Sequence, residues 1–319
     1  MKRLFPVMVS ILVALSTVML TACGNTATTS GQSASNGSQK LVVYTSFYPL
    51  YFVASRIGGD EVEVKNVVPP GVEPHDFEPT TNDIVEMSKA SLVVYSGTSF
   101  DAWVDKAIST FDTSKMKVVK TTEGLPLLSS PVHEGDTTGE EHNQDGLDPH
   151  VWLDPTLLKA EAKKVEDALI QADQAHQAIY QQNFDKLSKD LDQLDQEFAA
   201  MVSKSPRKEF MVSHAAFGYL AHRYGLEQVA ISGINPSDEP SPARMKELID
   251  RVNAHHIKTI FFETLASPKI SEVIAKETGA HTATLNPLEG LTEEQQKAGI
   301  DYLSVMRENL TALQSALQE

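Results

Sequence analysis

The chain has 319 residues, of which 43 are acidic and 27 are basic, and its formal net charge is -16 at pH 7 with neutral histidine. So acidic a balance argues against nucleic acid as a partner and against attraction to anionic headgroups. The chain has 1 cysteine, so no disulfide can form within it and any metal site must use imidazole and carboxylate ligands.

Residues 1–23 are similar to a bacterial lipoprotein signal peptide. Two basic residues at positions 2 and 3 precede an apolar run over 4–20, which ends in Leu-Thr-Ala-Cys. Small residues before a lone cysteine are what a lipoprotein signal peptidase needs, so we expect a diacylglyceride anchor on Cys23. The alternative is a transmembrane helix, for which the run is at the short end of the roughly 17–25 residues required. The sequence therefore predicts an extracytoplasmic protein, anchored by lipid to the cell membrane.

The first half of the remaining chain alternates between strand and helix patterns. Residues 24–39 are small and polar, which predicts a flexible tether. Structure is expected from residue 40, and an N-terminal α/β lobe is predicted over 40–172, because short β-rich runs separated by helical periodicities favour a parallel sheet. The expected strands are 41–44, 62–68, 91–95 and 117–120, and the expected helices among them are 50–57, 81–90 and 102–111.

A long acidic loop over 123–149 interrupts this alternation. It is rich in Gly, Asp, Glu, Ser and Pro and contains His133 and His142. Loops of this length are usually functional or mobile, so these two histidines are either accessory metal contacts or ordinary solvated side chains.

A long amphipathic helix is predicted to join two lobes. Apolar residues recur at steps of three and four between Ile179 and Met201, and polar residues fill the other face. We place a linking helix within 173–205, about 40 Å long at 1.5 Å per residue. A C-terminal α/β lobe over 206–319 follows, with expected strands at 210–212, 229–231, 259–262 and 282–285 and expected helices at 215–224, 242–256, 269–278 and 293–317. The predicted class is α/β, two lobes with mostly parallel central sheets flanked by helices.

Three of the ten histidines lie where α/β proteins place ligands. His75 follows the second strand, His150 lies where the long loop meets a helix, and His214 ends the first strand of the second lobe. Pro74 and Pro149 stiffen the backbone before two of them. Zinc favours four tetrahedral ligands, so three imidazoles would leave one position for a carboxylate or water. A single histidine is more often structural, and spacing alone leaves both readings open.

Four motifs in this order resemble the metal-binding lipoproteins of bacterial ABC importers, and most nearly the zinc-uptake branch of that adhesin-like group. The resemblance extends from Leu41 to the C-terminal helix, and its motifs are EPHDFEPT, DPHVWLDP, VSHAAFGYLAHRYGL and LNPLEGLT. It implies a metal site in the cleft between two lobes that are bridged by a rigid helix. The implied ligands are His75, His150 and His214, with Glu289 as the fourth. The alternative for Glu289 is a solvated carboxylate just before a helix.

The resemblance also implies the function. Such a protein captures Zn²⁺ outside the cytoplasm and passes it to an ABC permease driven by a cytoplasmic ATPase, and we expect a monomer that breaks no bond of a substrate. Glu263 ends a strand of the second lobe and either orients a ligand imidazole or caps a local helix. The loop of this chain is poorer in histidine than that of many zinc-branch relatives, which argues against strong metal scavenging by His133 and His142.

Three other functions stay open at this point. Manganese-uptake relatives resemble this chain but carry a carboxylate where His214 stands, and three imidazoles suit zinc better than the harder manganese ion. A zinc hydrolase would need an open position for water, and the sequence has no HExxH pattern. A surface adhesin with a structural metal is the third alternative, since some relatives carry that label.

Overall fold

The computed structural model describes residues 40–130 and 146–319. The predicted anchor Cys23, the tether and the loop residues His133 and His142 lie outside the described residues. Residues Lys40–Glu319 form one compact unit.

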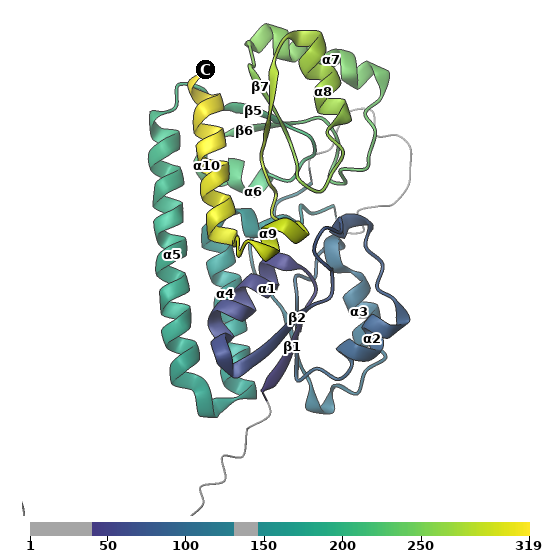
Figure 1. The fold of residues 1–319 in the computed structure, drawn as a ribbon, viewed down its shortest axis with the longest axis vertical. Helices are drawn as coiled ribbons and strands as arrows, with labels where there is room; N and C mark the ends of the chain where they lie inside the picture. The colour runs from purple at the N-terminus through teal and green to yellow at the C-terminus, as the bar shows by residue number, and fades with distance from the viewer. Residues whose placement is uncertain (1–39, 131–145) are drawn as a thin grey trace, which may run out of the picture. The chain divides into compact units, whose positions relative to one another are not determined.

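A parallel sheet of four strands organises the first lobe (Figure 1). Its strand order is β2-β1-β3-β4, so the chain starts in the interior of the sheet and crosses over between β2 and β3. All four residues of β3 are buried, as expected for an inner strand of a parallel sheet covered on both faces. The elements are β1 (Leu41–Thr45), α1 (Tyr48–Gly58), β2 (Val62–Asn66), α2 (Thr81–Met87), β3 (Leu92–Tyr95), α3 (Trp103–Ile108) and β4 (Lys117–Lys120).

The second lobe repeats this topology. Its strand order, β6-β5-β7-β8, is again parallel throughout, with the equivalent crossover between β6 and β7. This confirms the predicted α/β class with two parallel sheets. The elements are β5 (Glu209–Val212), α6 (Gly218–Tyr224), β6 (Glu227–Ala230), α7 (Pro242–His255), β7 (Thr259–Phe262), α8 (Lys269–Thr278) and β8 (His281–Thr284).

Helix α5 (Gln177–Lys204) packs against elements of both lobes. Its 28 residues span about 42 Å at 1.5 Å per residue. It contacts α1 and α4 (Pro155–Ala172) of the first lobe and α6 and α10 (Tyr302–Gln318) of the second, and Figure 1 shows it running beside α4 and α10. One apolar core continues from the first sheet through this helix to the second. A continuous core leaves the two lobes less freedom to move relative to each other than a flexible hinge of two connecting strands would.

The predicted helix over 293–317 is wrong in one respect, because the structure divides it in two. Helix α9 (Glu293–Lys297) ends before Gly299, whose φ of 71° lies in the left-handed region that glycine adopts at little cost. Asp301 then caps α10 by accepting a hydrogen bond from the Ser304 amide at 2.9 Å. The prediction joined the two helices because neither signal was recognised.

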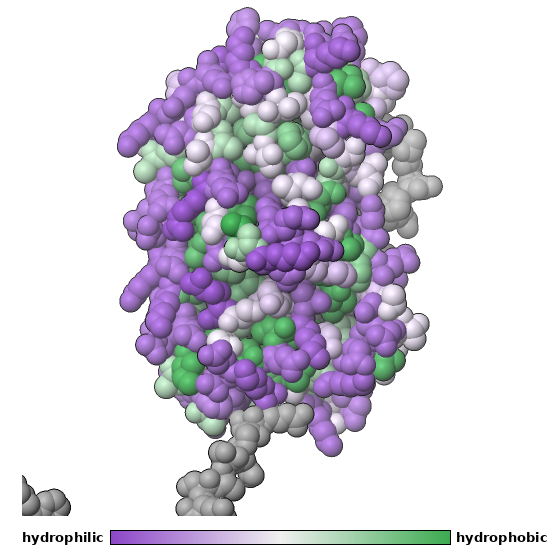
Figure 2. Space-filling view, viewed as in Figure 1, coloured by the Kyte–Doolittle hydropathy of each residue, from purple (hydrophilic) through white to green (hydrophobic). Residues whose placement is uncertain are grey.

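The face of the described residues that Figure 2 shows is mainly polar. Large apolar side chains are exposed singly, at Val85, Val118, Ile179 and Val273. Among the described helices, none combines the length and the apolar character needed to cross a membrane.

Candidate metal centre

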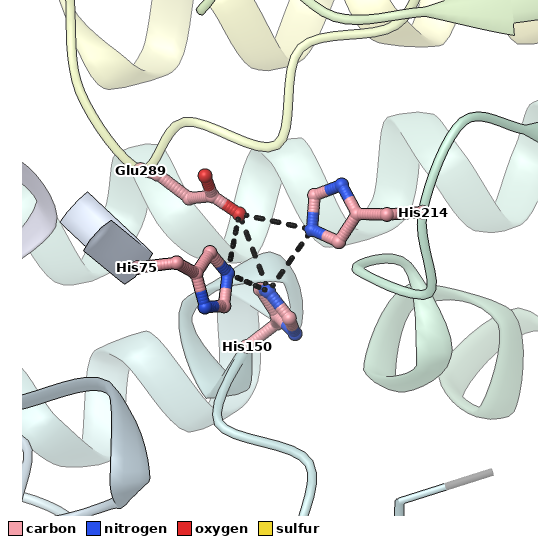
Figure 3. A group of neighbouring side chains, drawn as sticks. All are labelled: His75, His150, His214 and Glu289. Atoms are coloured by element: carbon pink, nitrogen blue, oxygen red, sulfur yellow. Dashed lines mark hydrogen bonds and ion pairs between the residues drawn. The ribbon is translucent and has the colours of Figure 1, made fainter. Parts of the chain in front are cut away.

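His75, His150, His214 and Glu289 converge on one point (Figure 3). His75 lies on a short 3-10 turn, Pro74–Asp76, after β2, and His150 directly precedes a second such turn, Val151–Leu153. His214 lies two residues beyond β5, and Glu289 is carried by the loop between β8 and α9. Two of these side chains therefore come from the first lobe and two from the second.

Five of the six distances within this group are those of a zinc tetrahedron. Glu289 Oε1 lies 3.3 Å from Nε2 of His75 and 3.2 Å from Nε2 of both His150 and His214. His150 Nε2 lies 3.3 Å from Nε2 of His75 and 3.4 Å from Nε2 of His214. A zinc ion with bonds of about 2.0–2.1 Å would separate its tetrahedral ligands by about 3.3–3.4 Å. Five of the six edges therefore have the length that such an ion requires, and the sixth, between His75 and His214, is within 4.8 Å.

The group is buried and its carboxylate is incompletely satisfied. His150 and His214 are fully buried, Glu289 is 1% exposed and the His75 side chain is 7% exposed. Neither oxygen of Glu289 has a hydrogen-bond partner, although one of them lies at ion-pair distance from three imidazoles. The alternative of a solvated Glu289 is therefore wrong. A buried carboxylate without hydrogen bonds is costly unless a cation neutralises it.

Two further carboxylates orient the imidazoles. Asp148 Oδ1 lies 2.8 Å from His150 Nδ1, and Glu263 Oε1 lies 2.6 Å from His214 Nδ1. Each carboxylate favours a proton on Nδ1, which leaves the Nε2 lone pair directed at the centre of the group. Glu263 also accepts a hydrogen bond from the Ser213 hydroxyl. Of its two predicted roles, Glu263 has the geometry of the one that orients an imidazole.

Sequence reasoning missed Asp148, although a signal was present. Both first-lobe histidines follow the pattern acidic residue, proline, histidine. Glu73 accepts a hydrogen bond from the His75 amide at 3.1 Å, and Asp148 accepts one from the His150 amide at 3.0 Å. The repeated pattern is thus a local turn that fixes the backbone before each histidine. Only Asp148 also reaches the ring.

The electrostatics of the group favour a bound positive charge. Burial lowers the pKa of His75 below its ordinary value, against the opposing attraction of Glu289. Burial would also lower the pKa of His214, but Glu263 and Glu289 outweigh it and hold that pKa well above the usual range. His75 and His214 in turn hold the pKa of Glu289 well below its usual range, although burial alone would raise it. Glu289 is therefore ionised at neutral pH.

Glu73 lies next to this charge and behaves differently. Burial, together with the nearby Glu289 carboxylate, raises the pKa of Glu73 to about 9. Glu73 is therefore a neutral carboxylic acid at pH 7, and Glu289 carries the single negative charge of the group.

The loop that carries Glu289 is held from both lobes. The Asn286 amide donates to Asn309 Oδ1 at 2.8 Å, and Asn309 Nδ2 donates to the Asn286 carbonyl at 2.7 Å. Trp152 Nε1 donates to the Pro287 carbonyl at 2.7 Å. Between them, Leu288 has a φ of 60°, which costs an ordinary side chain about 1–2 kcal/mol. Trp152 is buried and supports the loop from the first lobe.

The fold and the group define a class: a two-lobed protein in which donors from both lobes enclose one small cation. The family profile described as "Zinc-uptake complex component A periplasmic" (ZnuA) matches residues 43–316. The chain belongs to this family, whose members are components of extracytoplasmic metal uptake.

Individual relatives agree with this assignment. The chain is 37% identical over 302 residues to the high-affinity zinc uptake system protein ZnuA of Bacillus subtilis, covering 94% of each chain. It is 37% identical over 311 residues to the zinc-binding lipoprotein AdcA of Streptococcus pneumoniae, covering 97% of this chain and 60% of AdcA. The chain thus spans less than two thirds of AdcA.

Solved structures share the fold. The Zn(II)-bound ZnuA-like domain of S. pneumoniae AdcA has a TM-score of 0.75 at 37% identity, covering 88% of this chain and 100% of that one. The laminin-binding protein Lmb of Streptococcus agalactiae, described as an adhesin with metal-transporting activity, has a TM-score of 0.76 at 35% identity. That match covers 87% of this chain and 99% of Lmb.

Proposed function

We propose that this protein captures Zn²⁺ outside the cytoplasm and delivers it to an ABC permease powered by a cytoplasmic ATPase. The ion would be bound by Nε2 of His75, His150 and His214 and by Oε1 of Glu289. The observation that carries the proposal is the set of five interatomic distances of 3.2–3.4 Å, which match five of the six edges of a zinc tetrahedron. Membership in the zinc-uptake family supports the same ion.

The donor set favours zinc over manganese. Three neutral imidazoles and one carboxylate are borderline ligands, whereas manganese prefers oxygen and a higher coordination number. This distinction depends on His214, since a carboxylate at that position would replace a nitrogen ligand with an oxygen ligand, which manganese prefers.

The geometry favours binding rather than catalysis. A catalytic zinc keeps one position for water, and here all four corners of the tetrahedron are protein atoms. The protein would therefore hold its ion as cargo. Release would require the permease to separate the two lobes or to displace one ligand.

The proposal includes the following organisation. The lobes extend over 40–172 and 206–319, joined by a linking segment over 173–205. The protein acts as a monomer, and a diacylglyceride on Cys23 holds it at the outer face of the cell membrane. His133 and His142 would contribute at most accessory contacts to the ion. A Cys23→Ser variant should leave the membrane fraction, and its persistence there would contradict the anchor.

Metal titration tests the central proposal. The soluble form lacking residues 1–23 should hold one Zn²⁺ per chain, bind Mn²⁺ much more weakly and remain folded when a chelator removes the ion. His214→Ala should lose most of the zinc affinity. A preference for manganese, or no effect of the substitution, would overturn the assignment.

The same experiment tests the adhesin alternative, since the structural relative Lmb is described as an adhesin. A structural metal would be needed for folding, so chelation would unfold the chain. A cargo ion leaves a folded apoprotein behind.

A further inference from the structure

We propose that Asn309 and Trp152 are positioning residues for the fourth ligand: they hold the Asn286–Glu289 segment in a strained conformation that keeps Glu289 inside the tetrahedron. This inference rests on the proposed zinc site. Glu289, like His214, lies in a loop between a strand and a helix, whereas His75 and His150 lie on or directly beside a short 3-10 turn. The position of Glu289 therefore depends on what holds the loop.

The first support is the pair of hydrogen bonds between the loop and α10. The Asn309 side chain is 2% exposed, and its amide pairs with both backbone groups of Asn286, as neighbouring strands pair with each other. A side chain that satisfies a buried N–H and a buried C=O at once is hard to replace, because either group left alone would lose its only hydrogen bond. Asn309 thus fixes where the loop leaves β8.

The second support comes from the opposite lobe. Trp152 is 1% exposed, and its indole N–H donates to the carbonyl of Pro287. Tyr302 of α10 donates to the carbonyl of Trp152 at 2.6 Å, so the indole is itself held in place. Trp152 lies two residues after His150. One short segment therefore supplies a zinc ligand and a support for the loop that carries another.

The strain at Leu288 is the reason that these supports matter. Leu288 is fully buried, and its amide donates to the Asn286 side chain at 2.8 Å, which closes a tight turn immediately before Glu289. Its φ of 60° is one of two positive values among the non-glycine residues that the structure describes, the other being the helix-terminating His256. Without the supports, the turn would relax to an ordinary φ and carry the Glu289 carboxylate away from the imidazoles.

Loss of the supports should therefore leave a three-histidine site with an open corner. The ion would still bind, but it would lose the one anionic ligand, so affinity should fall about tenfold or more, as for other residues that orient metal ligands. Because the effect acts through Glu289, it should vanish when Glu289 is absent.

A double-mutant cycle with Zn²⁺ tests this dependence. The variants are Asn309→Leu, Glu289→Ala and both together, and affinity is measured by competition with a chromophoric chelator. We expect Asn309→Leu to weaken zinc binding about tenfold or more in the wild-type background and less than about threefold in the Glu289→Ala background. When Co²⁺ replaces Zn²⁺, the visible absorption spectrum of Asn309→Leu should match that of Glu289→Ala. Equal losses in both backgrounds, or no loss in the first, would overturn the proposal.

A matched control separates positioning from general stability. Asn183 on α5 also donates through its side-chain amide to a backbone carbonyl, that of Ile57 at 3.0 Å, but it supports no ligand segment. Asn183→Leu should lower the melting temperature without changing zinc affinity. If Asn309→Leu does not fold, Asn309→Asp replaces it in the cycle, since it keeps the acceptor and loses the donor. Failure of the wild-type protein to bind zinc would instead refute the proposed function.

Discussion

Replacing Asp148 by asparagine tests whether its carboxylate orients His150 for zinc binding in the cage of three histidines and Glu289. Asp148 Oδ1 accepts from both the amide and the ring Nδ1 of His150, at 3.0 and 2.8 Å. Asparagine keeps the shape and one acceptor oxygen but loses the charge. We expect the folded structure to survive and the imidazole to bind zinc less well.

The size of the effect follows from the hydrogen bond that loses its charge. Bonds to charged groups contribute about 1.5–3 kcal/mol and neutral ones about 0.5–1.5 kcal/mol, so the change costs about 1–1.5 kcal/mol. That difference corresponds to about a tenfold loss of affinity. Freer rotation of the ring adds to it, and outer-sphere substitutions at metal sites typically cost about 10–100-fold. We therefore expect Asp148→Asn to raise the zinc Kd between about 10-fold and 100-fold.

The assay is chelator competition at pH 7.5 on the soluble protein, with a control at a similar pair. Asp173 Oδ2 lies 2.6 Å from His176 Nδ1, beyond the far end of α4, whose 18 residues extend about 27 Å from the cage. Asp173→Asn should change stability slightly and zinc affinity not at all. Unchanged affinity in Asp148→Asn, or an equal loss in both variants, would refute the reasoning.

Three other outcomes are expected. Because zinc must displace protons from imidazoles, and the pKa of His214 is raised, zinc affinity should fall at least about tenfold per unit between pH 7 and pH 5; a flat profile in titrations would contradict a histidine cage. His214→Asp should shift the Zn²⁺/Mn²⁺ ratio toward manganese in competition, and an unchanged ratio would show that this position does not set selectivity. Glu161, 2% exposed with one unpartnered oxygen, has a pKa raised by burial to about 7, so its stabilising contribution is present below about pH 4.5 and lost as pH rises through 7. Glu161→Gln should therefore increase the free energy of unfolding at pH 8 by up to about 3 kcal/mol and change it little at pH 5, as measured in urea; no gain at pH 8 would contradict the raised pKa.

Much of the fold could be predicted from local patterns. Strand 92–95 is an uninterrupted apolar run, and the helix over 177–204 repeats apolar residues at helical steps, so both were found without knowledge of their neighbours. The break between α9 and α10 was missed because the signals of Gly299 and of the Asp301 cap were not recognised. Helix α9 is ended by the left-handed backbone conformation of Gly299 rather than by a change in hydrophobic burial.

The sequence by itself determined which residue types stand at the carboxyl ends of the strands, and with them the candidate ligands His75, His150 and His214. Whether those side chains meet is decided by the packing of one sheet against another through α5, which no local pattern contains. Only the tertiary structure buries Glu289 among the imidazoles and supports the loop in which Leu288 has a left-handed conformation. The physical reason is that burial, charge and strain are properties of surroundings that the chain supplies from more than 100 residues away, as when Trp152 bonds to Pro287.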